Sequence, residues 1–260
     1  MRRRLQSITN KIPAIVSIGL VVLLWHILSV TGIVPSYMLP SPSDVMKAFI
    51  EDFELIMMHA GVTLVEAFYG LLIGIAFAFI IATVMDRWTI MHKALYPIMI
   101  ITQTIPTIAI APLLVLWMGF EMEPKITLVA ITTFFPIAVG LLDGYKSVDR
   151  DYIDLMRAMG AGRYRIFTHV KIPAALPHFF SGLKVSTSYA VVGAVISEWL
   201  GGFEGLGVYM TRVKKAYAFD RMFAVIIFIV IISLLLMLLV NVIKTISMPW
   251  ILAEKRSKEQ

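Results

Sequence analysis

Long blocks of apolar residues, separated by short polar segments, dominate the hydropathy pattern of this chain. One uncharged block runs from Met222 to Val242, a stretch of twenty-one residues. An α-helix rises about 1.5 Å per residue, so such a block can cross a hydrocarbon core of about 30 Å. The apolar residues lie in blocks rather than in alternation, which favours membrane-spanning helices over strands.

We predict an all-α, polytopic membrane protein with six transmembrane helices. The predicted spans are Ile12–Val30, Gly61–Met85, Ala94–Gly119, Ile126–Leu142, Ala174–Glu198 and Met222–Val242. The third span contains three prolines, at positions 97, 106 and 112. We expect one kinked helix there, because neighbouring helices can satisfy the carbonyls that proline leaves free.

Composition agrees with a membrane protein and excludes several kinds of site. Hydrophobic residues make up 59% of the 260 positions and charged residues 15%, whereas soluble domains have about half and about a quarter. Without cysteine the chain has no disulfide and no cysteine-based metal or redox site. Its five histidines show no metal-ligand spacing, and no phosphate-binding G-x-x-x-x-G-K-[ST] loop occurs, so ATP chemistry must come from a partner.

The basic residues predict the orientation of the chain. The net charge of +6 indicates the positive-inside bias of a membrane protein rather than a nucleic-acid partner. With the N-terminus inside, 17 of the 23 Lys and Arg residues lie on the cytoplasmic side, and both termini are cytoplasmic. Arg2–Arg4 precede an apolar block without a cleavage site, so we predict an uncleaved first helix. The basic group between Arg212 and Arg221 falls on the outer side, and the sequence does not explain it.

The longest polar stretch, from Asp143 to Lys171, contains the clearest amphipathic segment. Apolar residues recur at helical spacing at Tyr152, Leu155, Met156 and Met159, with charged residues on another face. Gly160 then permits a sharp turn, and a second short helix from Arg163 is expected to end at Pro173. On pattern alone this segment could dock into a partner's groove or rest on lipid headgroups.

The spacing of this segment resembles the EAA loop of bacterial ATP-binding-cassette importers, E-A-A-x3-G-x9-I-x-L-P. The corresponding residues are Asp154, Leu155 and Met156 for E-A-A, Gly160 for the glycine, and Val170, Ile172 and Pro173 for the end. In that family the loop forms a coupling helix that docks on the ATPase subunit. Four further stretches resemble the permeases of nitrate, sulfonate, taurine and thiamine-precursor importers: Leu39–Val45, Ile105–Gly119, Phe134–Pro136 and Ser197–Gly207.

The resemblance, over about residues 20 to 245, implies a permease subunit without catalytic residues, metal or cofactor of its own. Its expected partners are a second copy, two ATPase subunits that bind ATP and Mg, an extracytoplasmic solute-binding protein and the bacterial cytoplasmic membrane. We expect one permease domain over residues 1–260, with the family core at about 61–245 and the coupling loop at about 143–173. The absence of arginine inside the spans favours a pyrimidine-type thiamine precursor over a sulfonate, taurine or nitrate. The alternatives are an ion-coupled secondary transporter and an integral-membrane enzyme.

Polar residues inside the predicted spans are the candidates for the pore. Gln103, Thr104 and Thr107 bracket Pro106 in the third span, where they could line a pore or bond to a neighbouring helix. Glu66 is expected about 10 Å inside the outer edge of the second span, facing either the pore or a neighbouring helix. Glu198 is expected near the outer surface, as an outer gate or as an ion pair that anchors a loop.

Overall fold

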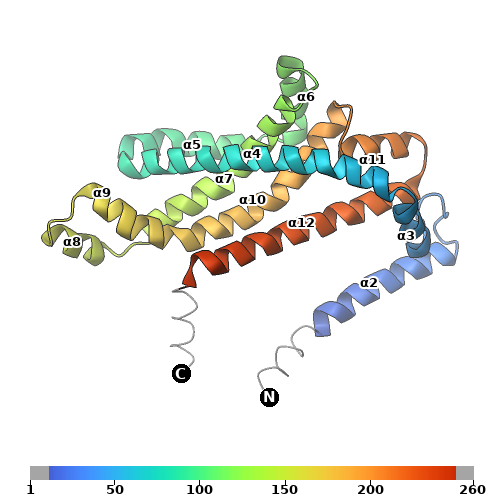
Figure 1. Cartoon of the computed structure of the whole chain (residues 1–260), viewed down its shortest axis with the longest axis horizontal. Coiled ribbons are helices and arrows are strands. Elements are labelled where there is room, and N and C mark those ends of the chain that lie inside the picture. The colour runs from blue at the N-terminus through green and yellow to red at the C-terminus, as the bar shows by residue number, and fades with distance from the viewer. Residues whose placement is uncertain (1–11, 250–260) are drawn as a thin grey trace. The chain divides into compact units, whose positions relative to one another are not determined.

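The computed structural model describes residues 12–249, which form helices and no strand (Figure 1). The chain forms two compact units. One consists of the segment up to Met58 together with Tyr209–Phe228. The other consists of His59–Val208 and the segment that begins at Ile229.

The first unit contains α2 (Ile12–Val30), α3 (Pro42–Glu51) and the ends of longer helices. The large apolar side chains of α2 are largely exposed, as expected for a helix that faces lipid. Helix α3 begins with Ser41, whose hydroxyl accepts a hydrogen bond from the amide of Asp44, and with Pro42 in its first turn. The indole of Trp25 donates to the carbonyl of Pro40 at 3.0 Å and stacks on Phe223.

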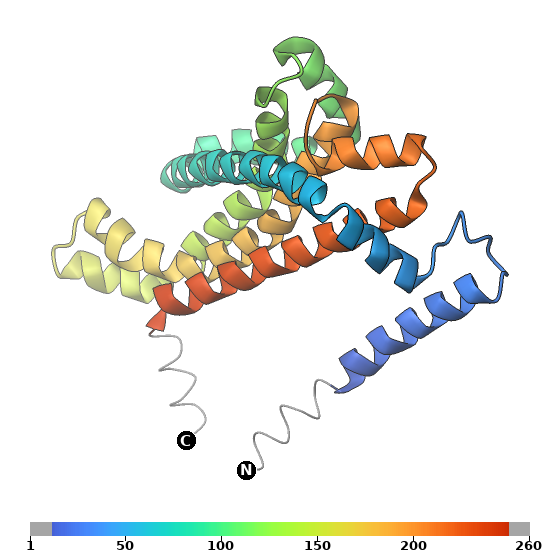
Figure 2. The same ribbon diagram turned by 45° about the vertical axis from the view of Figure 1, so that its right-hand side comes forward.

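The second unit contains the remaining helices. In chain order these are α4 (Phe53–Arg87, from His59), α5 (Thr89–Thr104), α6 (Thr107–Met118), α7 (Glu123–Lys146), α8 (Arg150–Ala158), α9 (Arg163–Ile166), the π-helical turn η1 (Phe167–Lys171), α10 (Ile172–Leu200), α11 (Leu206–Lys215, to Val208) and α12 (Phe219–Ser247, from Ile229). Helices α7 and α10 lie side by side along most of their length (Figures 1 and 2).

Small residues let α7 and α10 approach closely. A Cβ atom at Gly182 of α10 would lie 2.3 Å from the carbonyl oxygen of Pro136 of α7, and one at Gly144 would lie 2.5 Å from the Cα of Ala175. Near this contact Ser186 donates a hydrogen bond to the carbonyl of Thr133 at 2.8 Å. Such contacts stabilise helix pairs in lipid, where apolar burial alone provides little driving force.

The core of this unit lies where α4, α5, α7, α10 and α12 meet. Its larger members include Met85, Met99, Ile137, Leu142, Phe180 and Val240. Many apolar side chains point away from this core and are exposed, among them Phe77, Leu116 and Leu234. Exposed apolar surface of this extent indicates contact with lipid or with other chains.

Among residues 12–249, four helices are long and apolar enough to cross a membrane: α4, α7, the continuous helix Arg163–Leu200, and α12. They correspond to the second, fourth, fifth and sixth predicted spans, and each extends beyond the predicted bounds. The pair α5 and α6 can form a fifth span. The apolar stretch Ile15–Val30 of α2 is shorter, so the predicted count of six is not reproduced in full.

The prediction of one kinked helix from Ala94 to Gly119 is wrong. Helix α5 ends at Thr104, α6 begins at Thr107, and the two are bent by 97°. Ile105 has an extended backbone, with φ −78° and ψ 122°, as is usual for a residue before proline. Pro106 therefore breaks the helix.

The prediction that the second short helix ends at Pro173 is also wrong. The helical segment continues from Arg163 through η1 and α10 to Leu200. Pro173 lies in the first turn of α10, immediately after η1, where it has no N–H to contribute. The helix therefore passes Pro173 without a break.

Candidate functional site

Helix α8 presents an exposed apolar face next to a charged one. Tyr152, Leu155 and Met159 are 65%, 57% and 75% exposed. The carboxylate of Asp154 pairs with Arg157 at 2.9 Å, and both side chains are exposed. Within the described part of the chain nothing covers the apolar face, so α8 has the character of a helix that docks on a partner.

Gly160 ends α8 in a turn that requires a left-handed backbone. Its φ is +81°. The amide of Ala161 donates to the carbonyl of Met156, and the amide of Gly160 donates to Arg157, both at 2.9 Å. These two bonds form a Schellman motif, in which glycine is preferred because a side chain strains a positive φ. No atom lies within 4 Å of a Cβ added at Gly160, so the backbone rather than space selects glycine.

The loop is tied to the end of α4 by an ion pair that the sequence did not suggest. The ammonium of Lys171 lies 2.7 Å from each carboxylate oxygen of Asp86. The two side chains are 21% and 16% exposed. Val170, Ile172 and Pro173, the last predicted coupling positions, flank this pair and are partly buried. The end of the loop is thus fixed to α4 and continues directly into α10.

The break between α5 and α6 opens a small recess that contains two of the predicted pore residues. Gln103 and Thr107 line a cavity of about 240 Å³ together with Thr132, Tyr189 and apolar side chains. Thr104 and Pro106 are exposed and lie outside this lining. The hydroxyl of Thr104 instead donates to the carbonyl of Ile101 at 2.8 Å. The recess thus combines amide, hydroxyl and phenol groups without a charge.

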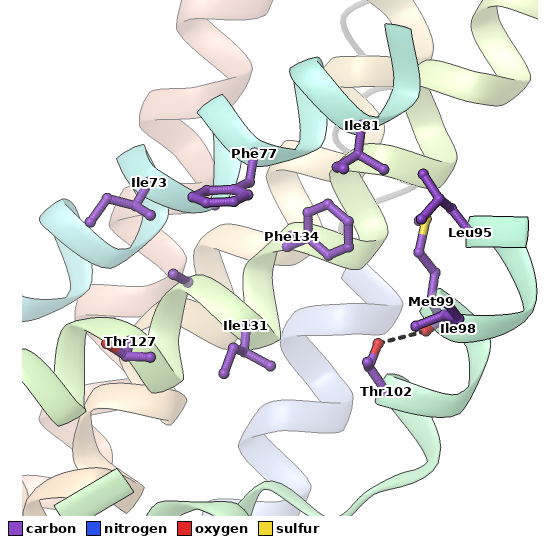
Figure 3. Close-up of a pocket in the computed structure, with 12 residues that line it drawn as sticks. Ile73, Phe77, Ile81, Leu95, Ile98, Met99, Thr102, Thr127, Ile131 and Phe134 are labelled. Carbon is purple, nitrogen blue, oxygen red and sulfur yellow. Dashed lines mark hydrogen bonds between the residues drawn. The ribbon is translucent and has the colours of Figure 1, made fainter. Parts of the chain in front are cut away.

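A larger recess on the other side of Thr102 is almost wholly apolar (Figure 3). It has a volume of about 500 Å³ and lies between α4, α5 and α7. Its two hydroxyls belong to Thr102 and Thr127, and Thr102 donates to the carbonyl of Met99 at 2.7 Å. Side chains such as Phe77 and Phe134 form the rest of its lining, which suits hydrocarbon better than a polar solute.

Glu66 and Glu198 lie in a buried polar cluster and not in either recess. The Glu66 carboxylate pairs with Lys125 of α7 at 2.8 Å, and these side chains are 0% and 5% exposed. Glu198 accepts a hydrogen bond from the hydroxyl of Thr63 at 2.7 Å and is 2% exposed. The two carboxyls also interact electrostatically. Removal of either partner from the Glu66–Lys125 pair would leave an uncompensated buried charge.

The cluster also holds the beginning of α11. Three consecutive backbone amides there donate to side chains of α4 and α10: Gly205 to His59 Nδ1 at 3.0 Å, Leu206 to Thr63 Oγ1 at 2.8 Å, and Gly207 to Glu198 Oε2 at 2.6 Å. Amides at a helix start have no partner within the helix, and a carboxylate there is favoured by the helix dipole. Glu198 therefore anchors the segment between α10 and α11: it accepts hydrogen bonds from Thr63 of α4 and from the amide of Gly207 at the start of α11.

The cluster and the coupling loop lie at opposite ends of α4. Twenty residues of this helix separate Glu66 from Asp86, a distance of about 30 Å. This equals the thickness of a hydrocarbon core. Helix α4 begins at Phe53 rather than at the predicted Gly61, so the helix extends well beyond Glu66 on the side away from Asp86.

In the first unit, part of the unexplained basic group has local partners. Arg221 lies 3.2 Å from Asp52 and 4.0 Å from Glu51. The phenol of Tyr209 donates to the same Asp52 carboxylate. Burial and the neighbouring Asp52 raise the pKa of Tyr209 above its ordinary value. The basic stretch is thus partly neutralised by the acidic end of α3.

Comparison with known proteins identifies the family of this chain. Residues 70–252 match the model of the family described as "Binding-protein-dependent transport system inner membrane component". The chain belongs to this family. It is therefore a multi-pass inner-membrane permease subunit of an ABC importer, and ATP hydrolysis belongs to a separate subunit of such systems.

Curated relatives cover nearly the full length of this permease. A probable ABC transporter permease protein of Haemophilus influenzae is 37% identical over 84% of this chain and 89% of its own. The formylaminopyrimidine transport permease protein ThiX of Halalkalibacterium halodurans is 34% identical over 89% of this chain and 92% of its own. The Bacillus subtilis protein named "Putative aliphatic sulfonates transport permease protein SsuC" is 27% identical over 82% of this chain and 78% of its own.

Solved structures share the fold. An inward-facing MetNI methionine ABC transporter matches with a TM-score of 0.58 at 21% identity, covering 76% of this chain and 95% of the other. A crystal structure of an amino acid ABC transporter with histidines gives a TM-score of 0.60 at 17% identity, covering 76% and 94%. The permease thus has the helical fold of ABC importer membrane subunits.

The sequence contained one overlooked signal for the buried cluster of this permease. His59, Thr63 and Glu66 follow one another at helical spacing, so they share a face of an otherwise apolar helix. Such a stripe predicts a polar partner on a neighbouring helix. Lys125 is the partner of Glu66. It lies one residue before the predicted fourth span, where a basic residue looks like an ordinary loop charge.

Proposed function

We propose that α8 docks on an ABC ATPase, and that two copies of the chain form a pore which receives solute from an extracytoplasmic binding protein. The observation that carries this proposal is the exposed apolar face of α8, fixed by the Gly160 turn and by the Lys171–Asp86 ion pair. Closure of the ATPase pair would move α8, and rigid-body rocking of the spans would alternate access to the pore.

In this proposal the end of α4 with Asp86 faces the cytoplasm and the buried polar cluster faces outward. The positive-inside bias supports this orientation. The basic group between Arg212 and Arg221 opposes this orientation, because the bias would place it inside. The ion pairs of Arg221 with Asp52 and Glu51 neutralise part of its charge. The terminal residues that carry much of the bias, Arg2–Arg4 and Lys255–Lys258, lie outside the described residues.

The recess at the break in the third span is the candidate for contact with solute. Its lining by Gln103, Thr107, Thr132 and Tyr189 offers donors and acceptors without a cation. Such a surface fits a neutral polar ring better than a sulfonate or nitrate anion. Together with the similarity to ThiX, this favours a pyrimidine-type thiamine precursor as the substrate, with an aliphatic sulfonate as the second candidate because of the similarity to SsuC.

The docking proposal can be tested with two leucines of equal exposure. Leu155 on α8 is 57% exposed and Leu234 on α12 is 58% exposed. Truncation of an interface anchor costs more than about 1 kcal/mol, which is about fivefold in affinity. Leu155→Ala should weaken binding of the purified ATPase to the reconstituted permease by at least this factor, whereas Leu234→Ala should not. Equal affinity of the two variants would contradict docking through α8.

Transport measurements separate the two remaining functional alternatives. Uptake of the pyrimidine by vesicles that contain permease, ATPase and binding protein should require internal ATP and should persist without an ion gradient. A requirement for the gradient alone would favour a secondary transporter. Chemical turnover of a lipid or solute by the isolated chain would favour an enzyme.

A further inference from the structure

We propose that a recess beside Glu66 and Lys125 binds a ligand through an amino or ammonium group. The recess lies at the end of α4 and α7 remote from the coupling loop, and its assignment does not depend on the importer function. It has a volume of about 360 Å³. Its lining consists of Gly61, Val62, Val65 and Glu66 of α4, Phe120, Glu121, Met122 and Lys125 at the start of α7, and Phe203 and Glu204.

The hydrogen bonding of Glu66 leaves one carboxylate oxygen with no donor besides the neighbouring Glu198 carboxyl. One carboxylate oxygen accepts from Lys125 at 2.8 Å. The other, Oε2, is buried and has no hydrogen-bond partner among the described residues. A buried charged oxygen without a donor is costly. A ligand nitrogen that reaches Oε2 would remove this cost.

The charge around the recess favours a cationic group over an anionic one. Lys125 pairs with the buried carboxyl of Glu66, which in turn interacts with the buried carboxyl of Glu198. Glu121 and Glu204 add two exposed carboxyls at the rim. The described residues contain no group of three or more His, Asp or Glu side chains that could hold a metal ion. The carboxyls of the recess are complementary to an amino or ammonium group.

The recess can also hold the apolar part of a ligand whose nitrogen reaches Glu66. Val62, Val65, Phe120 and Met122 supply apolar surface, and an aromatic face attracts a cation or stacks on a ring. A Cβ atom added at Gly61 would meet nothing within 4 Å, so the space over this glycine is open. Phe120 is 57% exposed, and a rotation of this rim side chain would admit a ligand to the floor.

Two sources can provide this chemistry at the membrane surface. One is a free amine or amino-substituted heterocycle, and the other is the ammonium of a phosphatidylethanolamine headgroup. The recess lies about 30 Å along α4 from Asp86, at the level where both have access.

The test uses the full-length chain in lipid nanodiscs made of phosphatidylcholine, with or without phosphatidylethanolamine. Calorimetric titration of 4-aminopyrimidine and ethanolamine into discs of phosphatidylcholine alone detects a soluble ligand. Native mass spectrometry of the mixed discs counts the phosphatidylethanolamine that the protein retains. Glu66→Gln removes the charge at the floor, and Gly61→Leu fills the recess without touching the Glu66–Lys125 pair.

Matched controls are Glu123→Gln, an exposed carboxylate on α7 outside the recess, and Gly19→Leu, a helical glycine that also has open space around it. Both test variants should weaken binding of the amine probe or retention of the aminolipid by about tenfold or more, as for a lost charged hydrogen bond. The arm that responds identifies the source. The proposal is overturned if neither arm shows binding to the unaltered chain, or if the test variants bind like their controls. A proton shared by the two carboxyls would then be the better account of the charge.

Discussion

The contact between Gly182 and Pro136 allows a quantitative test of how α7 and α10 pack. In Gly182→Ala the new Cβ would lie 2.3 Å from the carbonyl oxygen and 3.1 Å from the Cα of Ile137, whereas ordinary Cβ contacts begin at 3.4 Å. All the obstructing atoms belong to the backbone, so no side chain can rotate away. The helices must separate by about 1 Å, and overpacking of this kind costs about 1–3 kcal/mol.

The matched control is Gly61→Ala, where a Cβ meets nothing within 4 Å. Both substitutions gain the same helix propensity, about 1 kcal/mol, so the difference between them isolates the overpacking. Unfolding in mixed micelles titrated with sodium dodecyl sulfate should place Gly182→Ala about 1–3 kcal/mol below Gly61→Ala. The separation should also stretch the 2.8 Å bond from Ser186 to Thr133. Equal stability of the two variants would refute close packing of α7 on α10 at this point.

Three further predictions concern the sites described above. Lys125→Met should destabilise the permease by about 3–5 kcal/mol in the same micelle assay, because it leaves Glu66 buried without a counter-ion; the double variant with Glu66→Leu should recover much of the loss. At Gly160, binding of the ATPase should fall in the order Gly, Asn, Ala, Val, which is the order of tolerance for a left-handed backbone; an alanine variant that binds better than the asparagine variant would show that bulk, not backbone, matters. Thr107→Leu should reduce uptake per folded complex while ATP hydrolysis persists; if the hydroxyl only bonds to a helix, the variant should instead lose about 0.6 kcal/mol of stability and retain uptake.

Sequence reasoning located the elements whose signals are local. The start and end of α10 lie within two residues of the predicted fifth span, because length and hydropathy define a span without knowledge of its neighbours. Gly160 was predicted as a turn for the same reason, since a left-handed residue after an amphipathic helix needs glycine whatever surrounds it.

Features that depend on other helices could not be predicted in this way. Three prolines stand in the third span, yet Pro97 and Pro112 remain inside helices while Pro106 ends one. Their sequence contexts do not distinguish them. The partner of Glu66 is 59 residues away along the chain, and the partner of Lys171 is 85 residues away. A charge near a span end has the same appearance whether it is solvated or, like Lys125, buried.

The continuous helix from Arg163 to Leu200 connects the predicted coupling loop with the buried polar cluster at its other end. This segment has 38 residues and a length of about 57 Å. At one end it carries Lys171, which is bonded to α4, and at the other it carries Glu198, which holds the start of α11. Between them the close contact at Gly182 prevents α10 from sliding freely along α7. In the proposed mechanism, a displacement of α8 would pass through the turn at Gly160 to this continuous helix and along it to the buried polar cluster. The π-helical turn Phe167–Lys171 lies within this helix. The proposed docking at α8 and the proposed opening at the other end would then be linked by the continuity of this helix and would not require a chain of separate side-chain contacts.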